Sequence, residues 1–72
     1  MKMKQLEVVN MVKEFAKNAG YILVTVENLQ SDETSKNWVV EISGRTNVNA
    51  DVKKILVVND ETGEVTFQPT AK

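Results

Sequence analysis

The sequence contains no cysteine and no histidine among its 72 residues. Without cysteine, no disulfide can stabilise the fold and no thiolate can act as a nucleophile or a metal ligand. Without histidine, the chain lacks the side chain that most often serves as a general base and as a metal ligand. These absences argue against an enzyme, and the lack of cysteine agrees with a reducing cytoplasm.

The sequence also lacks an excess of either charge and any long apolar run. Nine basic and ten acidic residues give a net charge of −1 and are interspersed along the chain. Nucleic-acid-binding domains usually carry a basic patch, so we expect no nucleic-acid partner. No apolar run approaches the roughly 20 residues of a membrane-spanning helix, and Glu7 and Asn10 interrupt the segment where a signal peptide would be apolar. We therefore expect a cytoplasmic protein with no membrane span and no targeting segment.

The remaining composition is that of one small folded domain covering residues 1–72, with 42% hydrophobic residues. Apolar residues recur every three or four positions over 3–19 and predict an amphipathic helix, which Gly20 ends in a left-handed conformation. Strands rich in β-branched and aromatic residues are predicted at 21–29, 37–43, 52–59 and 64–68. Gly63 supplies the positive φ of a turn between the last two. We predict an α+β fold with one N-terminal helix packed on a four-stranded antiparallel meander sheet.

The alternation of apolar and other residues predicts which side of the sheet meets the helix. In the second strand, the apolar side chains of Trp38, Val40 and Ile42 alternate with another set that includes Glu41. The sheet residues predicted to face the helix are Val24, Trp38, Val40, Ile42, Val57, Val65 and Phe67. The helix residues predicted to lie opposite them are Val9, Val12 and Phe15.

Several strands are apolar at consecutive positions, notably 22–24, 39–40 and 55–58, so both faces of the sheet carry hydrophobic side chains. One helix can cover only one face. Either another chain covers the second face, as a partner protein or as a homodimer, or β propensity alone favours valine and isoleucine on a small exposed sheet. Under the first interpretation, the predicted partner surface consists of Leu23, Val39, Glu41, Leu56 and Val58.

No arrangement of polar residues in the sequence predicts a site for chemistry. The carboxylates are scattered, no serine has a histidine to activate it, and the isolated glycines form no phosphate-binding loop. The acidic segment 60–64 lacks the alternating oxygen ligands and the distal glutamate of a calcium loop, and it is typical of a hairpin turn. We therefore predict no catalytic residue, no metal site, no cofactor and no enzymatic activity. A small-ligand or nucleic-acid binder is the least favoured alternative.

The tryptophan strand and the last hairpin resemble those of the PepSY domain. The carrying segments are Trp38-Val39-Val40-Glu41-Ile42 and Val58-Asn59-Asp60-Glu61-Thr62-Gly63-Glu64-Val65, with Asn59 where PepSY domains typically have aspartate. PepSY domains are small helix-plus-sheet modules of peptidase propeptides and cell-envelope proteins, and they are not known for catalytic residues. The resemblance implies a non-catalytic module that binds a partner protein or itself through a face or an edge of its sheet.

A weaker similarity points to the gas vesicle accessory protein of the O class. In that family a tryptophan strand is followed by an arginine and, six positions later, by an aspartate that opens the next strand. Arg45 and Asp51 repeat this spacing, whereas Thr46 stands where the family has proline. This resemblance implies the alternative function of a structural accessory in gas vesicle assembly.

Overall fold

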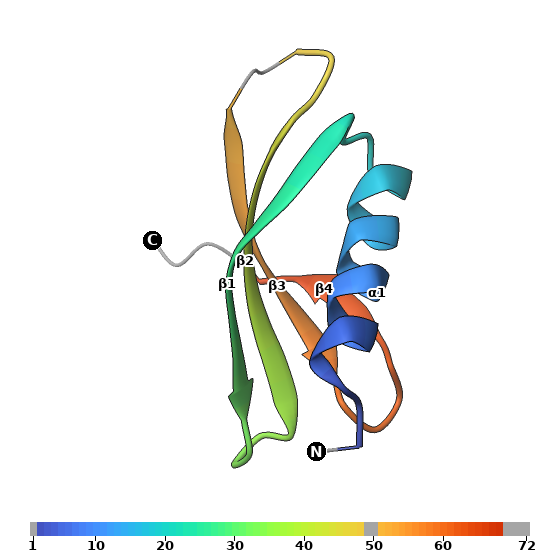
Figure 1. Cartoon of the computed structure of the whole chain (residues 1–72), viewed down its shortest axis with the longest axis vertical. Helices are drawn as coiled ribbons and strands as arrows, with labels where there is room; N and C mark the ends of the chain where they lie inside the picture. The colour runs from blue at the N-terminus through green and yellow to red at the C-terminus, as the bar shows by residue number, and fades with distance from the viewer. Residues whose placement is uncertain (1, 49–50, 69–72) are drawn as a thin grey trace.

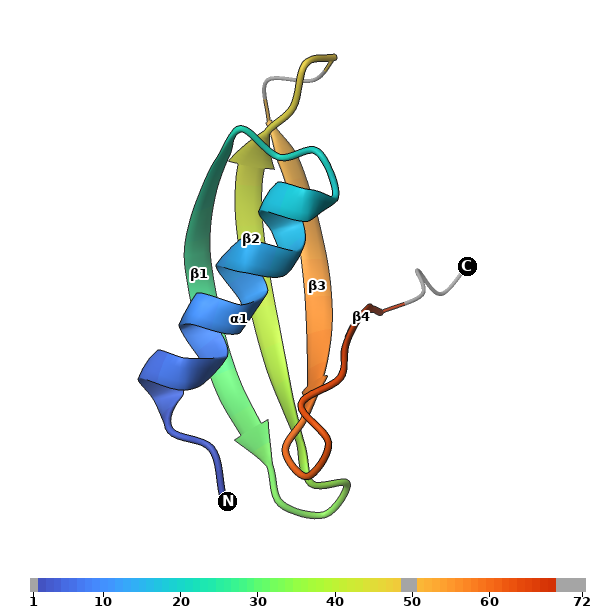
Figure 2. The same ribbon diagram turned by 90° about the vertical axis from the view of Figure 1, so that its right-hand side faces the viewer.

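The computed structural model describes residues 2–48 and 51–68, in which one helix packs against one antiparallel sheet (Figure 1). The elements are α1 (Gln5–Asn18), β1 (Leu23–Asp32), β2 (Asn37–Arg45), β3 (Val52–Asn59) and β4 (Val65–Phe67). The strands lie in the order β1-β2-β3-β4, and every neighbouring pair is antiparallel. Figure 2 shows α1 crossing one face of this sheet diagonally. The predicted α+β fold with a four-stranded meander is confirmed.

The strands differ from their predicted bounds mainly in the first hairpin. β1 begins at Leu23 rather than Tyr21 and continues to Asp32, which pairs with Asn37. β2 continues to Arg45 and is therefore two residues longer than its predicted range of 37–43. The added segments are largely polar. Backbone hydrogen bonding between the strands extends the hairpin beyond the reach of the hydrophobic pattern.

Of the helix residues predicted to face the sheet, Val12 is fully buried and Phe15 packs against the core, but the fully buried stripe of α1 follows a different spacing. Val8, Val12 and Ala16 are fully buried, whereas Val9 is only partly buried and Leu6 is 70% exposed. A helix has 3.6 residues per turn, so side chains spaced three apart rotate by about 60° per step and side chains spaced four apart by only about 40°. The four-residue spacing therefore keeps a straighter stripe toward the sheet.

In the described part of the chain, no helix is long and apolar enough to cross a membrane.

A β-bulge at Glu27 sets the direction of the side chains in β1. Val26 pairs with Ile42 and Asn28 pairs with Glu41, so Glu27 is an extra residue that no residue of β2 opposes in the ladder. Even-numbered side chains face α1 before the bulge, and Leu29 packs against the core after it. The bulge thus places apolar residues on one face although their spacing is not a multiple of two.

The core lies between the sheet and α1. Its buried hydrophobic members are Val8, Val12, Ala16, Tyr21, Trp38, Val40, Ile42, Leu56 and Val58. The predicted inward positions of Trp38, Val40 and Ile42 are confirmed, but the prediction for Val57 is wrong. Leu56 lies opposite Val40 and faces α1, so Val57 faces away from the helix. Residues 55–58 are all apolar, so alternation alone gave no information about which of them point inward.

Phe67 of β4 and Phe15 of α1 meet at the border of the core. Their ring centroids are 5.2 Å apart in an edge-to-face arrangement, which aromatic pairs prefer. Phe67 remains 38% exposed, while Val24 and Val65 are partly buried and pack against the core. These three residues lie on the helix side of the sheet, as predicted.

Gly44 leaves room for the aromatic ring of Tyr21. A Cβ atom on Gly44 would collide with the backbone carbonyl oxygen of Leu23 and would lie 2.6 Å from Cδ2 of Tyr21. Tyr21 is only 7% exposed and belongs to the core. A side chain at position 44 would therefore displace both β1 and the ring that closes this end of the core.

Candidate interaction surface

The sheet face that points away from α1 is called the open face. No helix or strand of the described chain covers it (Figure 1). Val39 of β2 lies directly opposite Val57 of β3 near its centre, and Ile55 is the next residue of β3 on the same face. These three residues, the apolar triad, are only partly buried by their neighbours in the sheet. Within the described residues nothing covers these branched apolar side chains, and contact with another molecule would remove them further from water.

Charged side chains of both signs border the apolar triad. Glu41 lies opposite Ile55, and Lys53 lies opposite Ser43. The hydroxyl of Ser43 donates a hydrogen bond to Oε2 of Glu27 at 2.6 Å, which holds that carboxylate over the open face. Acidic residues of β1 and β2 and a lysine of β3 therefore occupy neighbouring positions on the open face.

The structure places three of the five predicted surface residues on the open face and two in the core. Leu23 is 62% exposed, Val39 belongs to the apolar triad, and Glu41 is exposed beside it. Leu56 and Val58 are wrong as surface residues, because both have 0% exposure and pack toward α1. The cause is the same one-residue ambiguity in β3 that misplaced Val57.

The sequence did contain a signal for the two surface residues that the prediction missed, Ile55 and Val57. Thr66 is the polar residue in the middle of β4 and marks its outward side. Thr66 lies opposite Val57 in the final hairpin, and residues directly opposite each other share a face of the sheet. Pairing this hairpin before choosing the faces would have placed Ile55 and Val57 outside.

The free edges of the sheet carry features that oppose strand addition. β1 has the bulge at Glu27 in its middle, β4 has only three residues, and the part of β3 beyond β4 carries Lys53 and Lys54. Bulges, short edge strands and edge lysines are the devices by which natural sheets avoid pairing with other chains. The sheet is thus better suited to contact through its open face than through its edges.

Asp60 is the buried polar residue of the described chain, with 5% exposure. It follows β3 and accepts hydrogen bonds from the backbone N–H groups of Lys2 at 2.6 Å and Met3 at 2.9 Å, and from Nε1 of Trp38 at 2.9 Å. Its own backbone N–H donates to the carbonyl oxygen of Lys36 at 3.0 Å. The carboxylate of Asp60 therefore ties the N-terminal segment to β2, and its backbone N–H ties the turn after β3 to the turn before β2.

The pKa of Asp60 reflects these contacts. Desolvation by burial raises the pKa, but the hydrogen bonds from Lys2, Trp38 and Met3 together outweigh it and lower the pKa from 3.8 to about 2. Asp60 is therefore ionised at neutral pH. Its oxygens already accept three hydrogen bonds, so the group is committed to the fold rather than available as an acid or a base.

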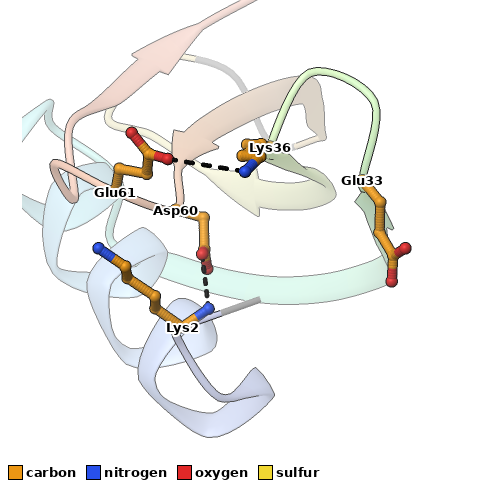
Figure 3. A pocket seen from close by; sticks show the side chains of 5 residues that line it. All are labelled: Lys2, Glu33, Lys36, Asp60 and Glu61. Carbon is orange, nitrogen blue, oxygen red and sulfur yellow. Dashed lines mark hydrogen bonds and ion pairs between the residues drawn. The ribbon is translucent and has the colours of Figure 1, made fainter.

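A shallow pocket of about 470 Å³ lies around Asp60, lined also by Lys2, Glu33, Lys36 and Glu61 (Figure 3). Lys36 and Glu61 approach to 4.0 Å across it, with both side chains more than half exposed. The mixed charges largely balance each other and are solvated. Within the described residues, no group of three or more acidic side chains could hold a metal ion. The pocket is therefore a weak candidate for ligand binding.

The chain matches no protein-family model, no curated protein and no solved structure. The similarities to the PepSY domain and to the gas vesicle accessory protein remain predictions that rest on the residues quoted for them.

Proposed function

We propose that this protein is a non-catalytic protein-binding module, PepSY-like in its arrangement, that binds through the open face of its sheet. The observation that carries the proposal is the apolar triad of Val39, Ile55 and Val57, which lies on a face with no covering element in the described chain. Burial of such side chains contributes about 25 cal/mol per Å² of apolar area, which is a sufficient source of affinity for a small interface. The bordering charges favour one orientation of the bound partner on this surface.

Binding through the face is better supported than binding through an edge. An edge interface adds a strand by backbone hydrogen bonds and needs a regular, unguarded strand. The bulge at Glu27 interrupts β1, and Lys53 and Lys54 occupy the free part of β3. The module is proposed to act without chemistry, because the sequence supplies neither histidine nor cysteine and the buried carboxylate of Asp60 is engaged in the fold. A cytoplasmic location remains part of the proposal, supported by the absence of cysteine.

The proposal is tested with Val57→Lys, which places a charge in the centre of the open face without touching the core. The matched control is Leu6→Lys, which makes the same kind of change at a residue 70% exposed on α1. Each protein is immobilised and used to capture partners from extract of the native host, and each candidate partner is then purified and its affinity measured. We expect loss of at least tenfold in affinity with Val57→Lys and none with Leu6→Lys. Equal affinities for the wild-type chain and both variants would contradict the proposal.

A second candidate function is that of a structural accessory in gas vesicle assembly. The spacing of Arg45 and Asp51 in the sequence supports it; Arg45 is the last residue of β2, and Asp51 immediately precedes β3. The test is the genomic neighbourhood in the source organism. Adjacent gas vesicle genes would support this function, and a neighbourhood without them would remove it.

A further inference from the structure

We propose that the occupant of the open face is a second copy of this chain, packed face to face about a two-fold axis that runs along the strands between β2 and β3. This inference rests on the proposed function and names its partner.

The proposed axis brings the apolar residues of the two copies together. A rotation about a line between β2 and β3 places β2 of one copy over β3 of the other at the same level along the strands. Val39 lies opposite Val57 within one sheet, so the rotation sets Val39 over Val57 of the second copy, and the reverse. The interface is isologous: Val39 and Val57 of the two copies cover each other, and Ile55 of each copy lies over Glu41 of the other.

The same rotation pairs opposite charges. Lys53 lies opposite Ser43 within the sheet, so Lys53 of one copy stands over Ser43 of the other. There it meets the carboxylate of Glu27, which Ser43 holds by the 2.6 Å hydrogen bond, and the neighbouring carboxylate of Glu41. Each ammonium group thus lies between two carboxylates of the second copy.

A second charge pair follows one step further along the strands. The register pairs Gly44 with Val52, so Arg45 and Asp51 occupy the next level. The rotation sets Arg45 of one copy over Asp51 of the other, and both are exposed in the single chain. Electrostatic complementarity of this kind selects the partner and its orientation more than it adds raw affinity.

The other two-fold arrangement of the two faces is less favourable. An axis across the strands, at the level of the apolar triad, would place Glu41 of one copy over Val39 of the other. The axis along the strands also sets Glu41 over an apolar residue, Ile55, but Lys53 of the second copy then lies beside the carboxylate. The axis across the strands leaves the buried carboxylate without that counter-charge, which is costly. The charge pattern therefore favours the axis along the strands.

The interface is small, so the dimer is expected to be weak. Strands lie about 4.8 Å apart and rise about 3.3 Å per residue, which limits the face to an area at the low end of specific interfaces. We expect a dissociation constant of roughly 10–100 µM, which corresponds to about 5.5–7 kcal/mol.

The test uses charge reversal in separate samples and in a mixture. Glu41→Lys places a lysine beside Lys53 of the second copy in its own homodimer, and Lys53→Glu places a glutamate beside Glu41 of the second copy in its own. In the mixed dimer, both contacts become attractive again. Sedimentation velocity across a concentration series should therefore show a dissociation constant at least tenfold higher for each variant alone. In the equimolar mixture, association should recover. Far-UV circular dichroism checks that each variant is folded.

A second pair of variants keeps the test decisive if one of the first pair fails to fold. Arg45→Glu and Asp51→Arg should show the same loss alone and the same recovery when mixed. Association that is unchanged in the single variants, or that does not return in either mixture, would overturn the proposed packing. A wild-type chain that stays at 8.1 kDa at about 1 mM, well above the expected dissociation constant, would overturn the homodimer. The capture experiment with Val57→Lys would then decide separately whether the open face binds a different protein.

Discussion

The indole Nε1 of Trp38 donates a hydrogen bond to Oδ1 of Asp60 at 2.9 Å in the buried part of the molecule. The two residues are 22 positions apart, one near the start of β2 and the other just after β3. A buried indole N–H needs an acceptor, and a buried carboxylate needs donors. The pair therefore satisfies both groups and fixes the end of the sheet beneath the N-terminal segment.

This arrangement predicts a specific loss of stability in acid. The pKa of Asp60 is lowered to about 2 in the folded chain, while an unfolded aspartate titrates near 3.9. The stabilisation by the ionised group is therefore fully present above about pH 4 and is lost progressively as the pH falls toward 2. Urea unfolding at several pH values, followed by Trp38 fluorescence, should show this decrease.

Asp60→Asn serves as the comparison for the acid effect. Asparagine keeps one acceptor oxygen for Trp38 but cannot accept from all three donors, so the variant should be less stable at neutral pH. The difference between the two proteins should shrink as the pH falls from 4 to 2, because only the wild-type chain loses a charge at position 60. A difference that stays constant over this range would show that the carboxylate is not titrating as described.

Gly44→Ala should destabilise the fold, because the new Cβ atom meets the backbone carbonyl of Leu23 and the ring of Tyr21. Overpacking of this kind costs about 1–3 kcal/mol, and a backbone atom cannot move aside as a flexible side chain can. Ser43→Ala, on the neighbouring open face, is the control and should change stability by less than about 1 kcal/mol. Urea unfolding measures both, and equal stabilities would contradict the close packing of Tyr21 on Gly44.

Leu56 and Val57 are adjacent in the sequence but lie on opposite faces, which predicts opposite responses to lysine. Leu56→Lys buries a charge where the leucine has 0% exposure and should cost at least about 3 kcal/mol, which is a large fraction of the stability of a small domain. Val57→Lys should keep a cooperative unfolding transition within about 1 kcal/mol of the wild type. Circular dichroism melts distinguish the two, and an unfolded Val57→Lys chain would contradict the assigned register.

The sequence was sufficient for the kind and order of the elements but not for every face. Where polar residues alternate with apolar ones, as around Trp38 and Glu41, the inward side was predicted correctly. Residues 55–58 are all apolar, so their pattern did not show which of them face α1. Two core residues of β3 were therefore predicted to lie on the surface. In α1, the residues predicted to face the sheet, Val9, Val12 and Phe15, are spaced three apart. The fully buried residues Val8, Val12 and Ala16 are spaced four apart.

The buried position of Asp60 could not be predicted from its local sequence. In the segment 60–64 it is one of several acidic residues in a hairpin turn, and nothing nearby distinguishes it from Glu61. Its role depends on Trp38 and on the backbone of Lys2, which come close only in the folded chain. Long-range polar contacts of this kind leave no periodic signal.

Removal of Glu27 tests the function of the bulge in β1. The pairs on either side of it, Val26 with Ile42 and Asn28 with Glu41, would become consecutive in a regular ladder if Glu27 were deleted. The deletion should therefore preserve the fold, with a change of no more than about 1 kcal/mol in the free energy of unfolding.

The control is deletion of Thr25, which lies on the same strand but before the bulge. That deletion would turn Val24 away from α1 and shift Tyr21 relative to Gly44. It should therefore lower the free energy of unfolding several times more than the Glu27 deletion does. Because bulges protect edge strands from pairing with other chains, the Glu27 deletion should also aggregate faster on warming, as measured by light scattering. Equal unfolding costs for the two deletions would show that Glu27 is not an extra residue in the ladder, and unchanged aggregation would show that the bulge does not protect this edge.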